Sequence, residues 1–153
     1  MKHAIKYSEV KDEDIFALAK FRSANNEEQI FWEQRITGYL KLTHHPQKAL
    51  HERIIFVAED DNKIIGFIAG HLTERFNCDG ELQWINVSEE YRNKKIGFEL
   101  LCVLNKWFIK HNAFKICVDP GNEFARRFYK KYGAEDLNNH WLFWKDVKEM
   151  KCD

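Results

Sequence analysis

The sequence predicts an α+β fold in which a mixed, largely antiparallel β-sheet is flanked by helices. Two apolar segments, residues 54–58 and 63–73, are separated by the turn-forming Asp60-Asp61-Asn62, which is typical of a β-hairpin. An apolar strand at residues 81–87 leads through a basic turn into a helix. A second strand and helix follow, so two strand–helix–strand units and antiparallel pairs share one sheet.

The first part of the chain is predicted to contain one strand, at residues 3–7, and two helices. Asp12 or Asp14 can cap the first helix at its N-terminus. Its apolar positions are Ile15, Phe16, Leu18, Ala19 and Phe21. The second helix runs from about residue 27 to residue 42. The residues on its predicted buried side are Ile30, Phe31, Ile36, Tyr39 and Leu40.

The rest of the chain supplies most of the sheet and two further helices. The predicted strands are residues 54–58, 63–73, 81–87, 114–118, 134–137 and 141–144. Between the last four strands lie a helix with apolar residues at helical spacing from Ile96 to Phe108, and a helix at residues 122–132. The predicted order of elements is therefore β-α-α-β-β-β-α-β-α-β-β.

Length and charge limit the classes of partner. A chain of 153 residues predicts a single domain covering residues 1–153. Its 24 basic and 24 acidic side chains give a formal net charge of zero, so neither nucleic acid nor an anionic membrane is an expected partner. The longest apolar run, residues 64–70, is far shorter than the ~20 residues of a membrane span.

The cysteines indicate a reducing compartment. There are four of them, Cys78, Cys102, Cys117 and Cys152. Cys102 and Cys117 lie within apolar helix and strand patterns, which favours buried free thiols over disulfides or metal ligands. The N-terminus is too charged for a secretory signal, so a cytoplasmic location is predicted. His44-His45 has no further ligands at metal spacing, and no metal site is expected.

The basic turn, Tyr91-Arg92-Asn93-Lys94-Lys95-Ile96-Gly97, lies between a strand and a helix. Such a turn leaves free backbone N–H groups at the positive end of the helix dipole, and these bind phosphate or pyrophosphate. On the later helix, Asn122 and Tyr129 fall within about 20° of each other, with Ala125 close to the same line. Phe124 and Phe128 are predicted to enter the core. The alternative is that Asn122 only caps the helix and Tyr129 only packs.

Two patterns in the sequence resemble the GNAT superfamily of acetyl-coenzyme A-dependent N-acetyltransferases: Tyr91-Arg92-x-x-Lys95-x-Gly97 and Asn122-x-x-Ala125-x-x-Phe128-Tyr129-x-x-x-Gly133-Ala134. The similarity covers about residues 54–145. The family turn reads Arg/Gln-x-x-Gly-x-Gly/Ala, so this chain departs from it by having Lys95 at the middle glycine. Glycine lets the loop approach the pyrophosphate closely, and Lys94 and Lys95 can compensate with charge.

The resemblance implies acetyl-CoA as the acetyl donor. Backbone N–H groups of the turn would bind its pyrophosphate, while residues 85–87 would splay from the neighbouring strand, pair with the pantetheine arm and polarise the thioester carbonyl. The implied cofactor-binding residues are Ile85, Asn86, Val87, Arg92, Asn93, Lys94, Lys95, Ile96, Gly97, Phe98, Asn122 and Ala125. Candidates for the 3′-phosphate are Arg126, Arg127, Lys130 and Lys131.

The resemblance also implies direct acetyl transfer to a primary amine in a ternary complex. Tyr129 matches the family's usual general acid, because a phenol of pKa ~10 can protonate the departing thiolate. Glu81 lies where several members carry a catalytic glutamate; it is a candidate base, with His71 or a water as the other candidates. The alternative for Glu81 is an ion pair with a nearby cation such as Arg75.

The acceptor amine is left open as a small molecule, a peptide N-terminus or a protein lysine. In the family, acceptor choice is shaped by the first two helices and the last hairpin, here about residues 22–40 and 138–141. The last strand could support a homodimer. The competing function is a non-catalytic acyl-CoA-binding or regulatory module that keeps the fold. A nucleotide enzyme is disfavoured because its glycine-rich motifs are missing from the sequence.

Overall fold

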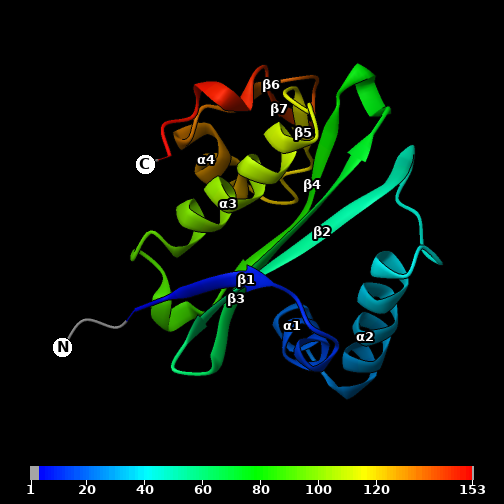
Figure 1. Ribbon diagram of the computed structural model, residues 1–153, viewed down its shortest axis with the longest axis vertical. Helices are drawn as coiled ribbons and strands as arrows, with labels where there is room; N and C mark the ends of the chain where they lie inside the picture. The colour runs from blue at the N-terminus through cyan, green and yellow to red at the C-terminus, as the bar shows by residue number, and fades with distance from the viewer. Residues whose placement is uncertain (1–3, 153) are drawn as a thin grey trace.

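A computed structural model describes residues 4–152, and the predicted fold class and element order are confirmed (Figure 1). The strands are β1 (Lys6–Glu9), β2 (Ala49–Asp60), β3 (Lys63–Thr73), β4 (Gly80–Val87), β5 (Ile116–Val118), β6 (Glu135–Asp136) and β7 (Leu142–Trp144). The α-helices are α1 (Ile15–Arg22), α2 (Asn26–Leu40), α3 (Ile96–Lys110) and α4 (Glu123–Lys131). Short 3₁₀ turns precede α1 and α3 and follow β3 and β7.

The strands form one sheet in the order β1-β2-β3-β4-β5-β7-β6. Every neighbouring pair is antiparallel except β4 and β5, which are parallel. The pairing of β4 with β5 ends at Leu82 and Val118. Beyond that point residues 83–87 of β4 have no partner in β5, so the sheet opens between these two strands.

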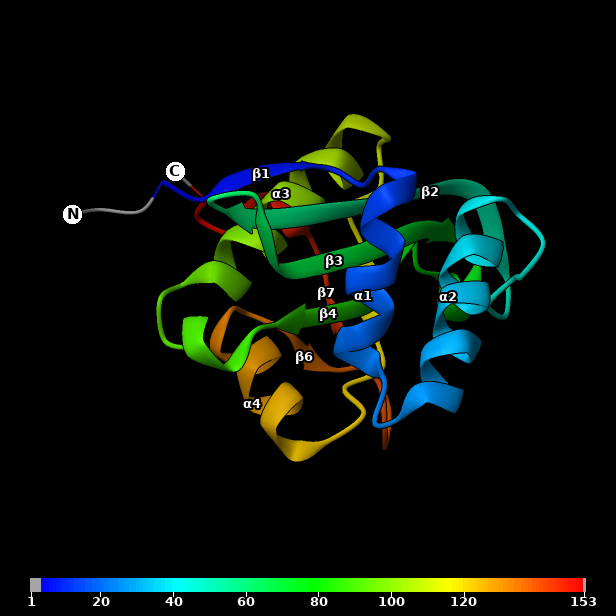
Figure 2. The ribbon, with the colours of Figure 1, turned by 90° about the horizontal axis from the view of Figure 1, so that it is seen from below.

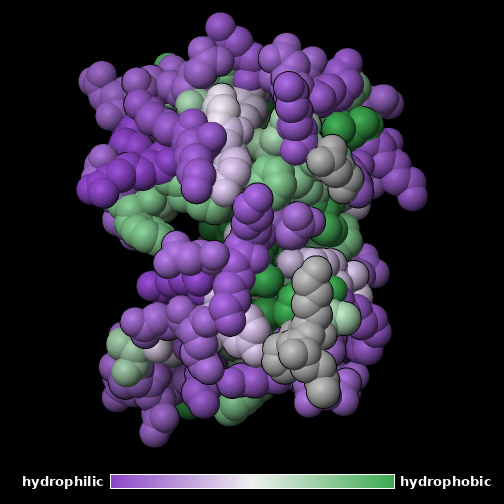
Figure 3. All heavy atoms as spheres, turned by 90° about the vertical axis from the view of Figure 1, so that its left-hand side faces the viewer, coloured by the Kyte–Doolittle hydropathy of each residue, from purple (hydrophilic) through white to green (hydrophobic). Residues whose placement is uncertain are grey.

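Helices cover both faces of the sheet, with α1 and α2 on one side and α3 and α4 on the other (Figures 1 and 2). Side chains of β2 alternate between the layers: Ile55 and Val57 pack with α1 and α2, whereas Ile54 and Ala58 pack with α3. On the face shown in Figure 3, polar side chains cover most of the surface and apolar ones gather near its middle. Because neighbouring side chains of the strands enter opposite layers, the core consists of two apolar layers separated by the sheet.

A β-bulge in β4 changes which way its side chains face. Ala69 pairs with Trp84 and Gly70 with Leu82, so Gln83 lies opposite no residue of β3. Without the extra residue, positions 82 and 84 would face the same layer. With it, Leu82 packs on the α3 side and Trp84 on the α1/α2 side.

Several predicted details near the N-terminus were wrong. The first strand lies at Lys6–Glu9 rather than residues 3–7, and residue 3 is outside the described residues. Ile30 and Phe31, expected to be buried, are 60% and 46% exposed. The first turn of α2 is polar, and only its C-terminal half, with Ile36 and Tyr39, is buried against the sheet.

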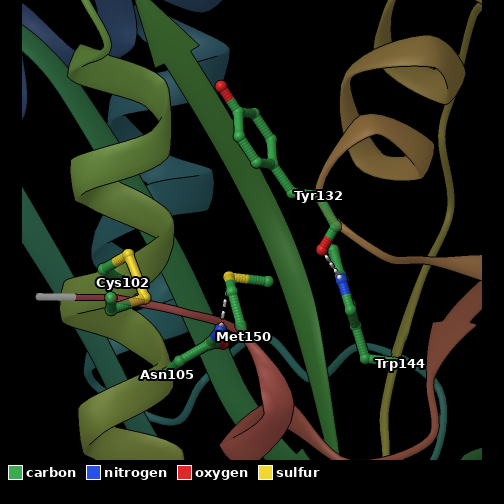
Figure 4. The surroundings of a disulfide bond; sticks show 6 residues. Cys102, Asn105, Tyr132, Trp144 and Met150 are labelled. Carbon is green, nitrogen blue, oxygen red and sulfur yellow. Dashed lines mark hydrogen bonds between the residues drawn. A yellow bond between two sulfur atoms is a disulfide. The ribbon is translucent and has the colours of Figure 1, made fainter.

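The prediction that Cys102 is a free thiol was also wrong, because Cys102 on α3 forms a disulfide with Cys152 (Figure 4). The C-terminal segment returns to α3, where Asn105 Nδ2 donates to Met150 Sδ at 3.1 Å. The cysteines are 50 residues apart, so their spacing gave no sign of the bond. Cys117 is a buried free thiol, as predicted. Disulfides persist mainly in oxidising compartments. The cysteines therefore no longer support the predicted cytoplasmic location, which stays a prediction.

We expect loss of this disulfide to lower the free energy of unfolding by about 2–4 kcal/mol, because it closes a long loop in the unfolded chain. The measurement is urea denaturation of the wild type with and without reductant. The Cys152→Ser variant is the control, since reductant should leave its midpoint unchanged. Equal midpoints for oxidised and reduced wild type would contradict the prediction.

Among residues 4–152, no helix is long and apolar enough to cross a membrane.

Candidate active site

A cleft of about 470 Å³ lies beside the opening between β4 and β5. β4, the basic turn and α4 line it. Of the residues assigned from the sequence, Ile85, Asn86, Val87, Arg92, Asn93, Lys95, Gly97, Asn122, Ala125 and Tyr129 line the cleft. Lys94, Ile96, Phe98 and Glu81 do not. The structure thus brings most of the predicted cofactor residues to one cavity.

The basic turn has an unusual backbone conformation at two residues. Asn93 and Lys95 have φ angles of 66° and 64°, in the left-handed region that favours glycine. Lys95 is the N-cap residue of α3, and its side chain makes no capping hydrogen bond. Lys95 therefore has the backbone conformation that glycine adopts most easily. Because its side chain does not cap the helix, the N–H groups at the start of α3 are free to bind an anion.

The Lys95→Gly variant is expected to be more stable than the wild type by about 0.5–1 kcal/mol. Glycine removes the cost of a left-handed backbone at a non-glycine residue, and this gain exceeds the extra conformational entropy that glycine loses on folding. Its affinity for CoA is expected to fall by about 2- to 5-fold, as one positive charge beside the helix start is removed. Thermal unfolding and calorimetric titration with CoA measure the two effects. Tighter CoA binding would instead mean that the lysine crowds the loop.

Two contacts hold the basic turn in place. The Tyr91 hydroxyl donates a short hydrogen bond to Asp60 Oδ2 at the end of β2, and this bond raises the pKa of Tyr91. Gly97 packs against the Phe128 ring of α4, and a Cβ at position 97 would lie 3.1 Å from that ring. The glycine therefore sets how closely α3 and α4 approach at the edge of the cleft.

On α4, both interpretations of Asn122 are correct. Its Oδ1 accepts a hydrogen bond from the Ala125 N–H at 2.8 Å, so Asn122 caps the helix, and it also lines the cleft. Phe124, predicted to enter the core, is 70% exposed and lines the cleft together with Phe128. The Phe124 ring lies 5.9 Å from the Arg92 guanidinium carbon, across the cleft, instead of reaching the sheet.

Of the four cations proposed for the 3′-phosphate, Lys131 alone lines the cleft. The other three pair with acidic side chains: Arg126 and Lys130 with Asp136, and Arg127 with Glu123.

Tyr129 is only 4% exposed, yet it lines both the cleft and a second cavity next to it. Its ring meets Trp144 edge-on at 5.7 Å. Within residues 4–152 its hydroxyl has no hydrogen-bond partner. Burial raises the pKa of Tyr129, with the Arg22 cation lowering it and the Asp119 carboxylate raising it to smaller extents. The phenol therefore keeps its proton at neutral pH.

Glu81 belongs to a buried polar cluster on the α2 side of the sheet. Its Oε1 lies 3.6 Å from both His71 Nε2 and a terminal nitrogen of Arg75. The Tyr39 hydroxyl is 2.7 Å from His71 Nδ1. Glu81 Oε1 and His71 Nε2 are buried without a hydrogen-bond partner within the described part of the chain. The ion pair with Arg75 is thus present, and both candidate bases lie side by side.

The second cavity, of about 390 Å³, meets the cleft at Tyr129 and at Asn86. It is lined mainly by polar groups, among them Arg22, Gln83 and Asp119. Sequence reasoning did not single out Gln83 or Asp119. The position of Asp119, directly after the parallel strand β5, is a signal that could have found it, because ligands bind outside the carboxyl ends of parallel strands.

Within residues 4–152, no group of three His, Cys, Asp or Glu side chains is placed to hold a metal ion.

The sheet opens between two parallel strands and an uncapped helix start lies beside the opening, which is the arrangement that the resemblance to the GNAT superfamily implies. The model of the acetyltransferase (GNAT) family matches residues 17–134. The chain therefore belongs to the GNAT acetyltransferase family. Among curated proteins, none matches the sequence.

Solved structures show the same fold at low sequence identity. The PaiA N-acetyltransferase of Thermoplasma acidophilum, in complex with coenzyme A, is 19% identical with a TM-score of 0.69, covering 94% of this chain and 99% of that one. A GNAT-family acetyltransferase of Staphylococcus aureus Mu50 is 18% identical, with a TM-score of 0.70 and the same coverage. A predicted acetyltransferase of Clostridium acetobutylicum, with acetyl-CoA, is 19% identical, with a TM-score of 0.68, covering 89% of this chain and 93% of that one.

Proposed function

We propose that this protein is a single-domain N-acetyltransferase that moves the acetyl group of acetyl-CoA to a primary amine in a ternary complex. The observation that carries the proposal is the convergence of three features on one cleft: the uncapped start of α3, the unpaired edge of β4 and Tyr129. Membership of the GNAT family supports it. So do the coenzyme A and acetyl-CoA complexes of proteins with the same fold.

In this proposal the basic turn holds the cofactor's pyrophosphate. Backbone N–H groups of residues 93–98 bind its oxygens, with helix-dipole stabilisation of about 0.3–1 kcal/mol. Arg92 and Lys95, which line the cleft, add positive charge. The free backbone edge of residues 85–87 pairs with the pantetheine arm and directs an N–H group at the thioester oxygen.

The amine nitrogen attacks the thioester carbon, so a C–N bond forms and the C–S bond breaks. Tyr129, which keeps its proton at neutral pH, donates that proton to the departing thiolate. The new amide nitrogen returns a proton to the Tyr129 oxygen. Before the attack, the acceptor's ammonium gives one proton to Glu81, which frees the nitrogen lone pair. Because neither Glu81 nor the adjacent His71 lines either cavity, the transfer to Glu81 runs through water.

The proposal is tested by following thiol release from acetyl-CoA in the presence of a panel of primary amines. Release that depends on an amine, with the acetylated amine identified by mass spectrometry, is the expected result. Tight CoA binding without release for any amine would favour the competing function, a non-catalytic acyl-CoA-binding module.

A further inference from the structure

The second cavity contains a cation whose environment is unusual. Arg22, the last residue of α1, has its guanidinium carbon 4.6 Å from the centre of the Trp32 ring and 5.6 Å from that of Trp84. One terminal nitrogen donates to Asn86 Oδ1 at 2.7 Å. Its Nε is buried and has no hydrogen-bond partner among the described residues. Two aromatic rings and one amide thus hold the guanidinium in a fixed orientation.

Arg22 has no carboxylate partner within residues 4–152. Its burial lowers the pKa of the guanidinium, with an opposing effect from Tyr129. A desolvated cation without a counter-ion is unfavourable, so such a site gains free energy when an anion binds. The planar guanidinium suits a carboxylate, which it can bind through two parallel hydrogen bonds.

Among the described residues that line this cavity, Asp119 is the one carboxylate. Asp119 Oδ1 is 2.7 Å from His140 Nε2 and accepts a hydrogen bond from the Gly121 N–H at 3.0 Å. Arg22, Asp119 and Tyr129 all line this cavity, and the two charges shift the pKa of Tyr129 in opposite directions. The lining of the cavity therefore offers one positive and one negative charge beside the proposed reaction centre.

Building on the proposed function, we infer that the acceptor is an amino-carboxylate, a molecule with one amine and one carboxylate. Arg22 binds the carboxylate, and Asp119 attracts the ammonium group before transfer. One charge of each sign matches a zwitterion. An amine with a phosphate fits less well, because its second negative charge would face Asp119 without a matching cation.

Matched acceptors test this inference through the rate of thiol release. β-Alanine is compared with ethylamine, γ-aminobutyrate with propylamine, and O-phosphoethanolamine with ethanolamine. We expect the carboxylate to raise kcat/KM by about 10- to 100-fold over the matched amine, the range of a hydrogen bond to a charged group. The phosphate should give a smaller gain. Equal rates within the carboxylate pairs, or a larger gain with the phosphate, would overturn the inference.

The Arg22→Gln variant removes the charge and keeps a hydrogen-bonding side chain. It should lower kcat/KM for β-alanine by about 10- to 100-fold more than kcat/KM for ethylamine, so that the preference for the carboxylate is lost. Arg35→Gln is the matched control, because Arg35 lies over Phe31 and outside both cavities, and it should keep the preference. An equal loss with both acceptors in Arg22→Gln would assign Arg22 a structural role only.

Binding of the reaction product separates this inference from the proposed function. With CoA present, N-acetyl-β-alanine should bind the wild type more tightly than N-ethylacetamide does, as measured by calorimetry. This result without any thiol release would retain the carboxylate site and reject the proposed activity. No difference in affinity would overturn the carboxylate site, whatever the activity. If Arg22→Gln does not fold, the wild-type comparisons alone decide.

Discussion

The Tyr129→Phe variant is expected to lose about 10²- to 10⁴-fold in kcat, the usual contribution of a positioned proton donor. Affinity for CoA should change little, because the phenyl ring retains the edge-on packing on Trp144. The hydroxyl is the only group removed, and it forms no hydrogen bond within residues 4–152. A large loss of rate with intact stability would thus come from the proton and not from the fold.

Steady-state kinetics and CoA titration measure these effects. Tyr7→Phe is the control, because burial raises the pKa of Tyr7 to about 12, yet this residue lies outside both cavities. Since burial raises the pKa of Tyr129, its proton should not be lost between neutral pH and the ordinary tyrosine pKa of ~10. The wild-type rate should therefore show no decline assignable to Tyr129 below that pH. Unchanged kcat in Tyr129→Phe would rule it out as the acid.

The second large effect is expected for Glu81→Gln, which should lower kcat/KM by about 10²-fold or more if the carboxylate accepts the amine proton. Glutamine keeps the shape of the side chain and removes its basicity. The pH profile of kcat/KM should change with the rate. A variant that keeps the wild-type rate and profile would remove Glu81 as the base.

Arg75→Gln distinguishes catalysis from structure at this position. It breaks the Arg75–Glu81 ion pair and leaves the carboxylate beside His71. If Glu81 serves only that ion pair, Arg75→Gln and Glu81→Gln should lower activity and melting temperature to the same degree. If Glu81 is the base, Glu81→Gln should lower kcat/KM much further at a similar melting temperature.

The sequence predicted the fold class, the element order and most of the cleft, because these depend on local signals. The apolar spacing of α3 places Leu100, Leu104 and Phe108 in the core, as expected. The basic turn and the start of α4 are each contained in a short segment, so their spacing showed which residues could share a site. The strands from β3 onward were also predicted to within two residues at each end, since turn residues mark their ends. The predicted strand at residues 54–58 was too short, because β2 runs from Ala49 to Asp60.

The remaining features depend on contacts between distant segments. Arg22 and Asp119 are almost a hundred residues apart in the sequence. They face one cavity because α1, which ends at Arg22, packs against β4, and β5, which is followed by Asp119, pairs with the same strand. The exposure of Phe124 follows from the position of α4 at the opening of the sheet, which a helical period does not specify. The bulge at Gln83 changes the side of the sheet to which the β4 side chains after it point. A strict alternation along the sequence would therefore assign Leu82 and Trp84 to the same layer, which is incorrect.

The Cys102–Cys152 disulfide has a topological consequence for the cleft. β5, α4, β6 and β7 all lie between the two cysteines, so one entire wall of the cleft belongs to a closed covalent ring. The ring is joined on α3, the helix that starts at the basic turn. A protease that cuts the chain once inside this ring opens it without releasing a fragment. The nicked molecule keeps both walls linked, and it separates into two pieces only after reduction.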